Sequence, residues 1–376
     1  MPTPASESEL SEAVAAADGP LRVIGGGTRP VGRPVAGAAL SVAGLTGVEL
    51  YEPGALTIVV RAGTPLAEVE ALLASENQRL PFEPMDHRAL LGTAGEPTIG
   101  GVVAANVSGP RRIQAGACRD SLIGVRFVDG RGEVLKNGGR VMKNVTGYDL
   151  VKLMAGSWGT LGVLTEVAFK VLPATEQQAS VLIDGLSGHQ AVEAMATALG
   201  SPFEVSGAAH LPWGGGGTPV TMLRLEGFAA SVEYRLGRLS ELMAPFGAVR
   251  AEVEPDAVAS AWRAVRDVLP FAEAPGDVWR ISVKPSDGPD VAARTEGETF
   301  LDWGGGLIWA RVEEGTDLRA RLGAFAGHAT LVRASEETRA RIAPFQPEPA
   351  PIAALSQGLR DKFDPRGILN PGLMAA

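Results

Sequence analysis

The chain has 376 residues, of which 34 are basic and 43 acidic, and its net charge at neutral pH is −9. This length exceeds the size at which one hydrophobic core usually stops growing, so we expect two domains. The acidic balance argues against nucleic acid as the main partner. The single cysteine, Cys118, excludes intramolecular disulfides, cysteine-rich zinc sites and an iron–sulfur cluster held by this chain alone.

The sequence carries no signal for a membrane span or a metal site. No segment approaches the ~20 apolar residues that cross a bilayer, and a chain with one cysteine suits a reducing compartment. We therefore expect a cytoplasmic protein whose contact with a membrane is peripheral or made through partners. The four histidines form no pair at metal-ligand spacing, so no metal is predicted.

Two glycine clusters dominate the first half of the sequence. The first, at 25–28, directly follows a predicted apolar strand at 21–24, and the second, at 98–101, leads toward Asn106. Glycine is favoured where backbone N–H groups approach a phosphate closely, because no Cβ stands in the way. A side chain at Gly26 is therefore predicted to block the phosphate and to disfavour a positive φ. One cluster alone is typical of a tight turn, but two in order favour a nucleotide site.

The rest of the first half predicts short strands and few long helices. Strands are predicted at 56–61, 123–128 and 133–135, and the last two form a hairpin. Glycines at every third position of the loop 156–162 allow it to wrap closely around a flat, polar ligand. The Gly-x-Gly-x-x-Gly fingerprint with an acid on the next strand is missing after the first strand. The predicted fold class is therefore α+β and not a doubly wound nucleotide fold.

After residue 173 the pattern becomes a mixture of strands and helices. Strands are predicted at 181–183, 220–225, 249–253, 278–283, 300–303 and 307–312, and helices at 190–199, 232–243 and 257–268. This mixture predicts one antiparallel sheet with helices packed on a single face. Near the C-terminus, apolar residues from Ile352 to Phe363 fall at helical spacing, and Pro365 ends the helix.

The motifs of the first half resemble a known family of flavoproteins. The glycine clusters, the Gly-Tyr-Asp-Leu turn at 147–150 and the Gly-Thr-Leu-Gly-Val-Leu-Thr-Glu loop at 159–166 resemble the FAD-binding domain of the vanillyl-alcohol oxidase / p-cresol methylhydroxylase (PCMH-type) family. The segments 109–112 and 116–126 narrow the resemblance to the FAD-binding E subunits of bacterial glycolate oxidase. The segment 363–372 is similar to the tail by which FAD-linked 2-hydroxy-acid oxidases return to the flavin domain.

The resemblance implies three parts and one cofactor. These are a PCMH-type two-part FAD-binding domain at 1–173, an antiparallel-sheet cap domain for the substrate at 174–345, and a C-terminal helix and tail at 346–376 that pack back on the FAD domain. No histidine lies in or just after the first glycine cluster, and Cys118 is expected to be a buried packing residue. We therefore expect FAD to be bound non-covalently.

The resemblance also assigns residues to the cofactor. Pyrophosphate contact is implied for Gly25, Gly26, Gly27 and Thr28, flavin or ribityl contact for Thr98, Gly100, Gly101 and Asn106, and adenine contact for Gly162, Val163 and Thr165. Gly109 and Arg111 lie in a segment that should pass near the flavin. For Arg111 and Arg112 four alternatives stay open, namely contact with phosphate, with substrate, with another subunit or with solvent. Asn370 is either a structural cap of the tail or a contact to the flavin edge.

Oxidation of a 2-hydroxy acid needs a cation for the substrate carboxylate and a base for the hydroxyl proton, while the flavin does the redox chemistry. Arg224 and Arg280, on predicted strands of the second domain, are candidates for the cation. A solvated or salt-bridged arginine is the alternative for each. His210 is the candidate base, and a hydrogen-bonded loop histidine is its alternative.

The resemblance implies the FAD-binding subunit of a glycolate oxidase complex, which oxidises glycolate to glyoxylate. Its partners would be a second FAD-binding (D) subunit and an iron–sulfur (F) subunit, because this chain has too few cysteines for its own cluster. Two alternatives stay open. One is a free-standing FAD-dependent dehydrogenase for D-lactate or another 2-hydroxy acid, and the other is a non-catalytic flavin-binding scaffold.

Overall fold

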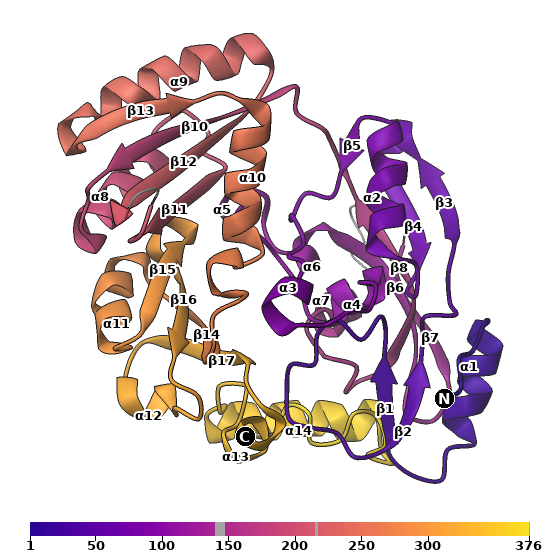
Figure 1. The fold of residues 1–376 in the computed structure, drawn as a ribbon. Coiled ribbons are helices and arrows are strands. Elements are labelled where there is room, and N and C mark those ends of the chain that lie inside the picture. The colour runs from indigo at the N-terminus through magenta and orange to yellow at the C-terminus, as the bar shows by residue number, and fades with distance from the viewer. Residues whose placement is uncertain (140–146, 215–216, 376) are drawn as a thin grey trace. The chain divides into compact units, whose positions relative to one another are not determined.

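A computed structural model describes residues 1–139, 147–214 and 217–375, and these form two compact units (Figure 1). Unit 1 comprises Met1–Ser108, Gly116–Ala174 and Pro347–Ala376, and unit 2 comprises Gly109–Ala115 and Thr175–Gln346. The short segment Gly109–Ala115 therefore packs with the second unit although the first unit surrounds it in sequence.

Unit 1 is built on a five-stranded antiparallel sheet in the order β3-β4-β8-β6-β7, with two-stranded pairs β1-β2 and β5-β9. Its strands are β1 (Leu21–Ile24), β2 (Ala38–Ser41), β3 (Val48–Glu52), β4 (Thr57–Arg61), β5 (Gln78–Arg79), β6 (Leu122–Val128), β7 (Val134–Gly138), β8 (Val163–Lys170) and β9 (Leu172–Pro173). Its helices are α1 (Glu7–Ala15), η1 (Pro53–Ala55), α2 (Leu66–Ser75), α3 (Arg88–Leu91), α4 (Ile99–Ala104), α6 (Cys118–Ser121), α7 (Leu150–Met154) and α14 (Ala350–Phe363).

The predicted hairpin is confirmed as β6 and β7, and its turn is held by one carboxylate. Asp129 Oδ1 accepts hydrogen bonds from the backbone N–H groups of Arg131 and Glu133, at 2.8 and 2.9 Å. Asp129 is buried, and a buried carboxylate needs hydrogen-bond donors to offset the loss of water, which these two N–H groups supply. Cys118 is fully buried, as expected, and burial raises the pKa of its thiol.

The C-terminal tail returns to unit 1, which confirms this part of the predicted fold. Leu21 N–H donates to Ile368 O at 2.7 Å, and Asn370 N–H donates to Leu21 O at 2.9 Å, so the tail lies beside β1. The helix expected before the tail is α14. Its apolar positions Ile352 and Leu355 are 48% and 68% exposed.

Unit 2 is an eight-stranded antiparallel sheet in the order β13-β10-β12-β11-β15-β16-β14-β17. Its strands are β10 (Gln177–Asp184), β11 (Gly207–Leu211), β12 (Val220–Gly227), β13 (Ala248–Glu252), β14 (Asp277–Val283), β15 (Glu298–Asp302), β16 (Leu307–Val312) and β17 (Gly327–Arg333). Its helices are α5 (Arg112–Ala115), α8 (Gly188–Leu199), α9 (Ala229–Met243), η3 (Ala244–Phe246), α10 (Pro255–Arg266), η4 (Leu269–Phe271), η5 (Pro285–Asp287), α11 (Gly288–Arg294), η6 (Trp303–Gly305), α12 (Leu318–Leu322) and α13 (Glu336–Arg341).

The antiparallel sheet confirms the prediction, but helices cover both of its faces. Ala179 and Val181 of β10 join a core with residues of α8 and α9. Ser180, between them, points to the other face and accepts a hydrogen bond from Trp262 Nε1 of α10 at 2.9 Å. The expectation of helices on one face was therefore wrong for α10. Alternation along a strand defines two faces but does not say which of them a helix covers.

Among the described residues, no helix has both the length and the apolar character needed to cross a bilayer.

Candidate functional site

The first glycine cluster forms an open row of backbone donors at the end of β1. Within the described residues, no hydrogen bond is donated by the backbone N–H of residues 25–28. Gly27 has a φ of +70°, a conformation that glycine adopts without strain. Successive N–H groups in such a loop form a concave site for an anion. These residues therefore fit the diphosphate of a dinucleotide cofactor.

Gly26 packs against a second backbone segment, a contact that the sequence did not predict. A Cβ on Gly26 would lie 1.5 Å from Glu96 O, and a Cβ on Gly95 would lie 1.7 Å from Gly26 O. The positive φ in the cluster belongs to Gly27 and not to Gly26. The expectation of a positive φ at Gly26 was therefore wrong, while its contact with the phosphate stays a prediction. Glycine is needed here because two backbone segments touch.

The second glycine cluster lies against the first. Thr98 is the N-cap of α4, and its Oγ1 accepts a hydrogen bond from Gly101 N–H at 3.3 Å. The same Oγ1 lies 2.6 Å from the position that a Cβ on Gly25 would take. Gly100 packs on Ala62, with its N–H donating to Ala62 O at 2.8 Å. The fold thus brings Gly25, Thr98 and Gly101 together, as a shared cofactor site requires.

The third predicted loop and the C-terminal tail meet at Asn370. Its Oδ1 accepts from Val23 N–H at 2.8 Å, and its Nδ2 donates to Trp158 O at 2.8 Å. Trp158 N–H in turn donates to Ala104 O of α4 at 2.9 Å. Asn370 therefore joins the tail to β1 and to the loop that contains Trp158, which supports the structural alternative for this residue. Its contact with the flavin edge stays a prediction.

The residues predicted near adenine and ribityl have partners within unit 1. Val163 is part of the core beneath α1, and a Cβ on Gly162 would lie 2.6 Å from the ring of Phe127. Thr165 Oγ1 donates to Glu7 Oε1 at 2.6 Å. Asn106 Oδ1 accepts from the backbone N–H of Arg119 at 3.1 Å. Cofactor contact by these residues stays a prediction.

Arg111 forms a buried ion pair in unit 2 and is not solvated. Its Nε and Nη2 donate to the two carboxylate oxygens of Glu226 at 2.9 and 2.7 Å. Both side chains are more than nine-tenths buried. Gly109, two residues earlier, accepts a hydrogen bond from Trp303 Nε1 at 3.1 Å. Both residues lie in the segment that packs with unit 2, and their contact with FAD stays a prediction.

Arg224 and His210 have structural partners. Arg224 is 1% exposed, donates to Ser206 Oγ at 3.1 Å, and lies 4.7 Å from the ring centre of Trp262. His210 lies on β11 and not in a loop, and its Nδ1 is 3.0 Å from Thr221 Oγ1. Burial lowers the pKa of His210 to about 4, so the ring is neutral at pH 7.

Strand alternation separates His210 from both candidate arginines. Thr221 and Leu223 point to the core of α8 and α9, so His210, bonded to Thr221, points there too. Arg224 on β12 and Arg280 on β14 each lie between two residues of this core. They therefore point to the opposite face of the sheet. His210 therefore cannot act as a base beside either arginine within unit 2.

Arg280 belongs to a cationic cluster that the sequence did not reveal. The guanidinium carbons of Arg112 and Arg280 lie 4.8 and 4.9 Å from the ring centre of Trp303. Burial lowers the pKa of Arg280 to about 10, and the charge of Arg112 acts in the same direction. Burial and both arginines also lower the pKa of His328. The Arg280 side chain makes no hydrogen bond or ion pair with any described residue, so its donors can serve an anion.

Asp302 is the acidic neighbour of this cluster. It is buried, and its Oδ1 accepts a hydrogen bond from the backbone N–H of Trp303 at 2.7 Å. Nothing in the sequence marks these residues as neighbours, because Arg112, Arg280 and Trp303 come from distant segments. Within the described ranges, no group of three His, Cys, Asp or Glu side chains could hold a metal ion.

The open N–H cradle and the packed glycine loops fit the binding of a flavin nucleotide, and the chain is a flavin-nucleotide-binding protein of the PCMH type. Residues 2–138 match the family described as FAD binding domain, and FAD is the cofactor. The chain belongs to the family of glycolate oxidase subunit GlcE. It is 37% identical to the GlcE protein of Escherichia coli (strain K12) over 361 residues, which cover 95% of this chain and 93% of that protein.

Other relatives match more narrowly. Glycolate oxidase subunit GlcD of Bacillus subtilis is 33% identical over 34% of this chain and 26% of its own length. D-lactate dehydrogenase of Anaerostipes hadrus is 31% identical over 39% of this chain and 29% of its own length. A solved structure of alkyldihydroxyacetonephosphate synthase is similar in fold, with a TM-score of 0.72 at 15% identity over 98% of this chain and 76% of that one.

Proposed function

We propose that this chain is the FAD-binding subunit of a glycolate oxidase complex and takes part in the oxidation of glycolate to glyoxylate. The observation that carries the proposal is the match to GlcE along almost the whole of both chains. Similarity to a GlcD subunit supports a complex of several subunits. An iron–sulfur partner is proposed as the electron acceptor because this chain has one cysteine.

Oxidation of glycolate removes the hydroxyl proton and one hydrogen of the carbon with its electron pair. Bound FAD supplies the two-electron acceptor. The residues of the first two glycine clusters would hold it, with the open N–H groups of 25–28 on the diphosphate. Unit 2 would hold the substrate, since its cationic cluster offers donors for a carboxylate.

We assign substrate binding to Arg280 with Arg112. His328, and not His210, is then the proposed proton acceptor. A carboxylate binds a guanidinium through two parallel hydrogen bonds, and Arg280 has donors available for them. His328 lies on β17, on the face that Arg280 shares, and its lowered pKa keeps it neutral and able to accept a proton at pH 7.

The proposal is tested by dye-linked glycolate oxidation. We expect the isolated chain to oxidise glycolate poorly or not at all, and the complex copurified with its D and F subunits to be active. The physical reason is that the chain lacks an electron relay of its own. Comparable turnover per flavin in the two samples would favour a free-standing 2-hydroxy-acid dehydrogenase. A flavin on this chain that glycolate does not reduce within the active complex would favour a scaffold.

Substitution of Arg280 tests the substrate site. In the active complex, Arg280→Met should raise the KM for glycolate about 10- to 100-fold, because hydrogen bonds to a charged group are worth about 1.5–3 kcal/mol. Arg250→Met is the control, since Arg250 pairs with Asp184 at a half-exposed position on another strand. An unchanged KM for Arg280→Met would assign substrate binding to a partner subunit.

A further inference from the structure

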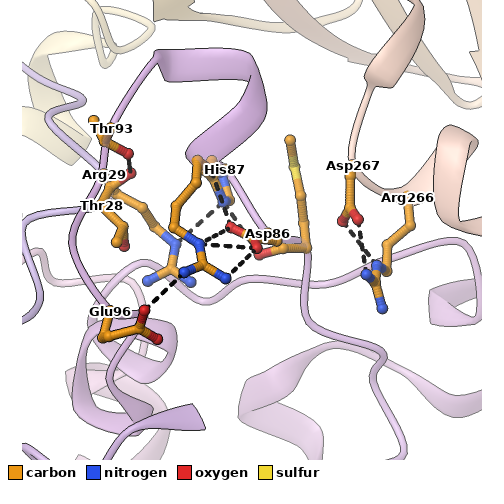
Figure 2. A network of polar contacts seen from close by, with 10 residues as sticks. Thr28, Arg29, Asp86, His87, Thr93, Glu96, Arg266 and Asp267 are labelled. Carbon is orange, nitrogen blue, oxygen red and sulfur yellow. Dashed lines mark hydrogen bonds and ion pairs between the residues drawn. The ribbon is translucent and has the colours of Figure 1, made fainter. Parts of the chain in front are cut away.

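Arg29 directly follows the first glycine cluster, and its side chain is only partly satisfied. Its Nε donates to His87 Nδ1 at 3.2 Å (Figure 2). Its Nη2 is buried and has no hydrogen-bond partner among the described residues. A buried polar group without a partner costs free energy, and a charged one costs more. Such an atom therefore points to a partner that is absent from the chain itself.

The acidic side chains near Arg29 are occupied by another arginine. Both oxygens of Asp86 accept hydrogen bonds from Arg88, at 2.9 to 3.1 Å, and Arg88 Nη1 also pairs with Glu96 at 3.0 Å. Arg29 forms no ion pair with a described residue. Burial lowers its pKa to about 10, so the guanidinium is charged at neutral pH. The charge of Asp86 favours the charged form of Arg29, but it leaves the buried Nη2 without a hydrogen bond, and this donor is available to a ligand.

The guanidinium lies where the two glycine clusters meet. Arg29 Nη1 is 3.4 Å from the position that a Cβ on Gly101 would take, and Thr98 Oγ1 is 3.1 Å from the same position. Thr98 also contacts the first cluster at Gly25. The backbone N–H groups of 25–28 and the guanidinium of Arg29 therefore lie in the same part of unit 1, and both have hydrogen-bond donors available.

We propose that Arg29 binds the diphosphate of the flavin nucleotide and makes the site select phosphorylated flavins over riboflavin. The planar guanidinium offers two parallel donors that match phosphate oxygens. His87 holds Nε, and this leaves the outer nitrogens for the anion. The inference rests on FAD as cofactor but not on glycolate as substrate, so its test uses binding and not turnover.

The test compares Arg29→Gln with the native chain, both freed of flavin. Titration with FAD, followed by flavin fluorescence, should show a Kd about 10- to 100-fold higher for the variant, as expected for loss of hydrogen bonds to a charged group. The Kd for riboflavin, which has no phosphate, should change less than about 3-fold, a shift of under ~0.7 kcal/mol. Raising the salt concentration should weaken FAD binding more in the native chain than in the variant.

Stability of the flavin-free protein separates ligand binding from a structural role. Removing an unpaired buried charge should leave the Tm of flavin-free Arg29→Gln equal to that of the native chain or higher. Arg29→Lys keeps the charge but lacks the planar guanidinium with its parallel donors. Its affinity for FAD should lie between those of the native chain and Arg29→Gln.

Arg88→Gln is the matched control, because the Arg88 guanidinium is fully engaged by Asp86 and Glu96. It should leave the ratio of FAD to riboflavin affinity unchanged. Equal losses of FAD and riboflavin affinity in Arg29→Gln would overturn the proposal. A lower Tm of the flavin-free variant with an unchanged affinity ratio would also overturn it and assign Arg29 a structural role.

Discussion

Gly26→Ala should abolish FAD retention and lower the stability of the protein. A Cβ at this position would lie 1.5 Å from Glu96 O, a backbone atom that cannot move aside like a flexible side chain. The first glycine cluster and the segment that precedes the second would be forced apart, and with them the residues that line the cradle. We expect a loss of about 3 kcal/mol or more, which corresponds to a Tm lower by about 6–12 °C for a unit of this size.

The measurement is the Tm of the flavin-free protein together with the flavin content after purification. Measuring the flavin-free form matters because loss of a bound ligand by itself lowers the apparent stability. Gly54→Ala is the control in the same unit: no atom lies within 4 Å of its Cβ position, and its φ is not positive. That variant should stay within about 0.5 kcal/mol of the native chain. A Gly26→Ala protein with native flavin content and Tm would contradict the packing of Gly26 on Glu96.

Glu226→Ala should destabilise the protein by about 3–5 kcal/mol, because it leaves a buried cation without its partner. Arg111 and Glu226 are joined by two hydrogen bonds, and their side chains are 7% and 3% exposed. Glu226 Oε2 also lies 3.6 Å from Arg224 Nε. Removing Glu226 therefore takes a carboxylate away from two buried guanidinium groups. Segment Gly109–Ala115, which carries Arg111, would lose its ionic anchor on β12.

Denaturant unfolding followed by circular dichroism measures this effect. The double variant Arg111→Met/Glu226→Leu should recover part of the loss, since both charges are then removed together. Arg250 and Asp184 provide an exposed comparison pair, and Asp184→Ala should cost less than about 1 kcal/mol. If Glu226→Ala costs no more than Asp184→Ala, the buried pair does not anchor the segment.

Local signals in the sequence determined much of the fold of this protein. The glycine clusters, the hairpin around Asp129 and the helical spacing before Phe363 each follow from the conformations available to a few neighbouring residues. The α+β class was predicted from such local signals, and the FAD-binding domain from the resemblance to a known family; both are confirmed. Their common property is that the determining contacts are close in sequence.

Only the tertiary structure decided which side chains meet. Arg111 and Glu226 are 115 positions apart, and Asn370 reaches Val23 across 347 positions. The periodic pattern placed Arg280 on a strand but did not predict the strand that carries His210, and it cannot say that the two side chains point to opposite faces of the sheet. The same limit applies to Gly26, where the sequence does not show that a Cβ would collide with the backbone carbonyl of Glu96. Sequence fixes local conformation through short-range sterics, whereas burial and pairing of charges depend on which distant segments the fold packs together.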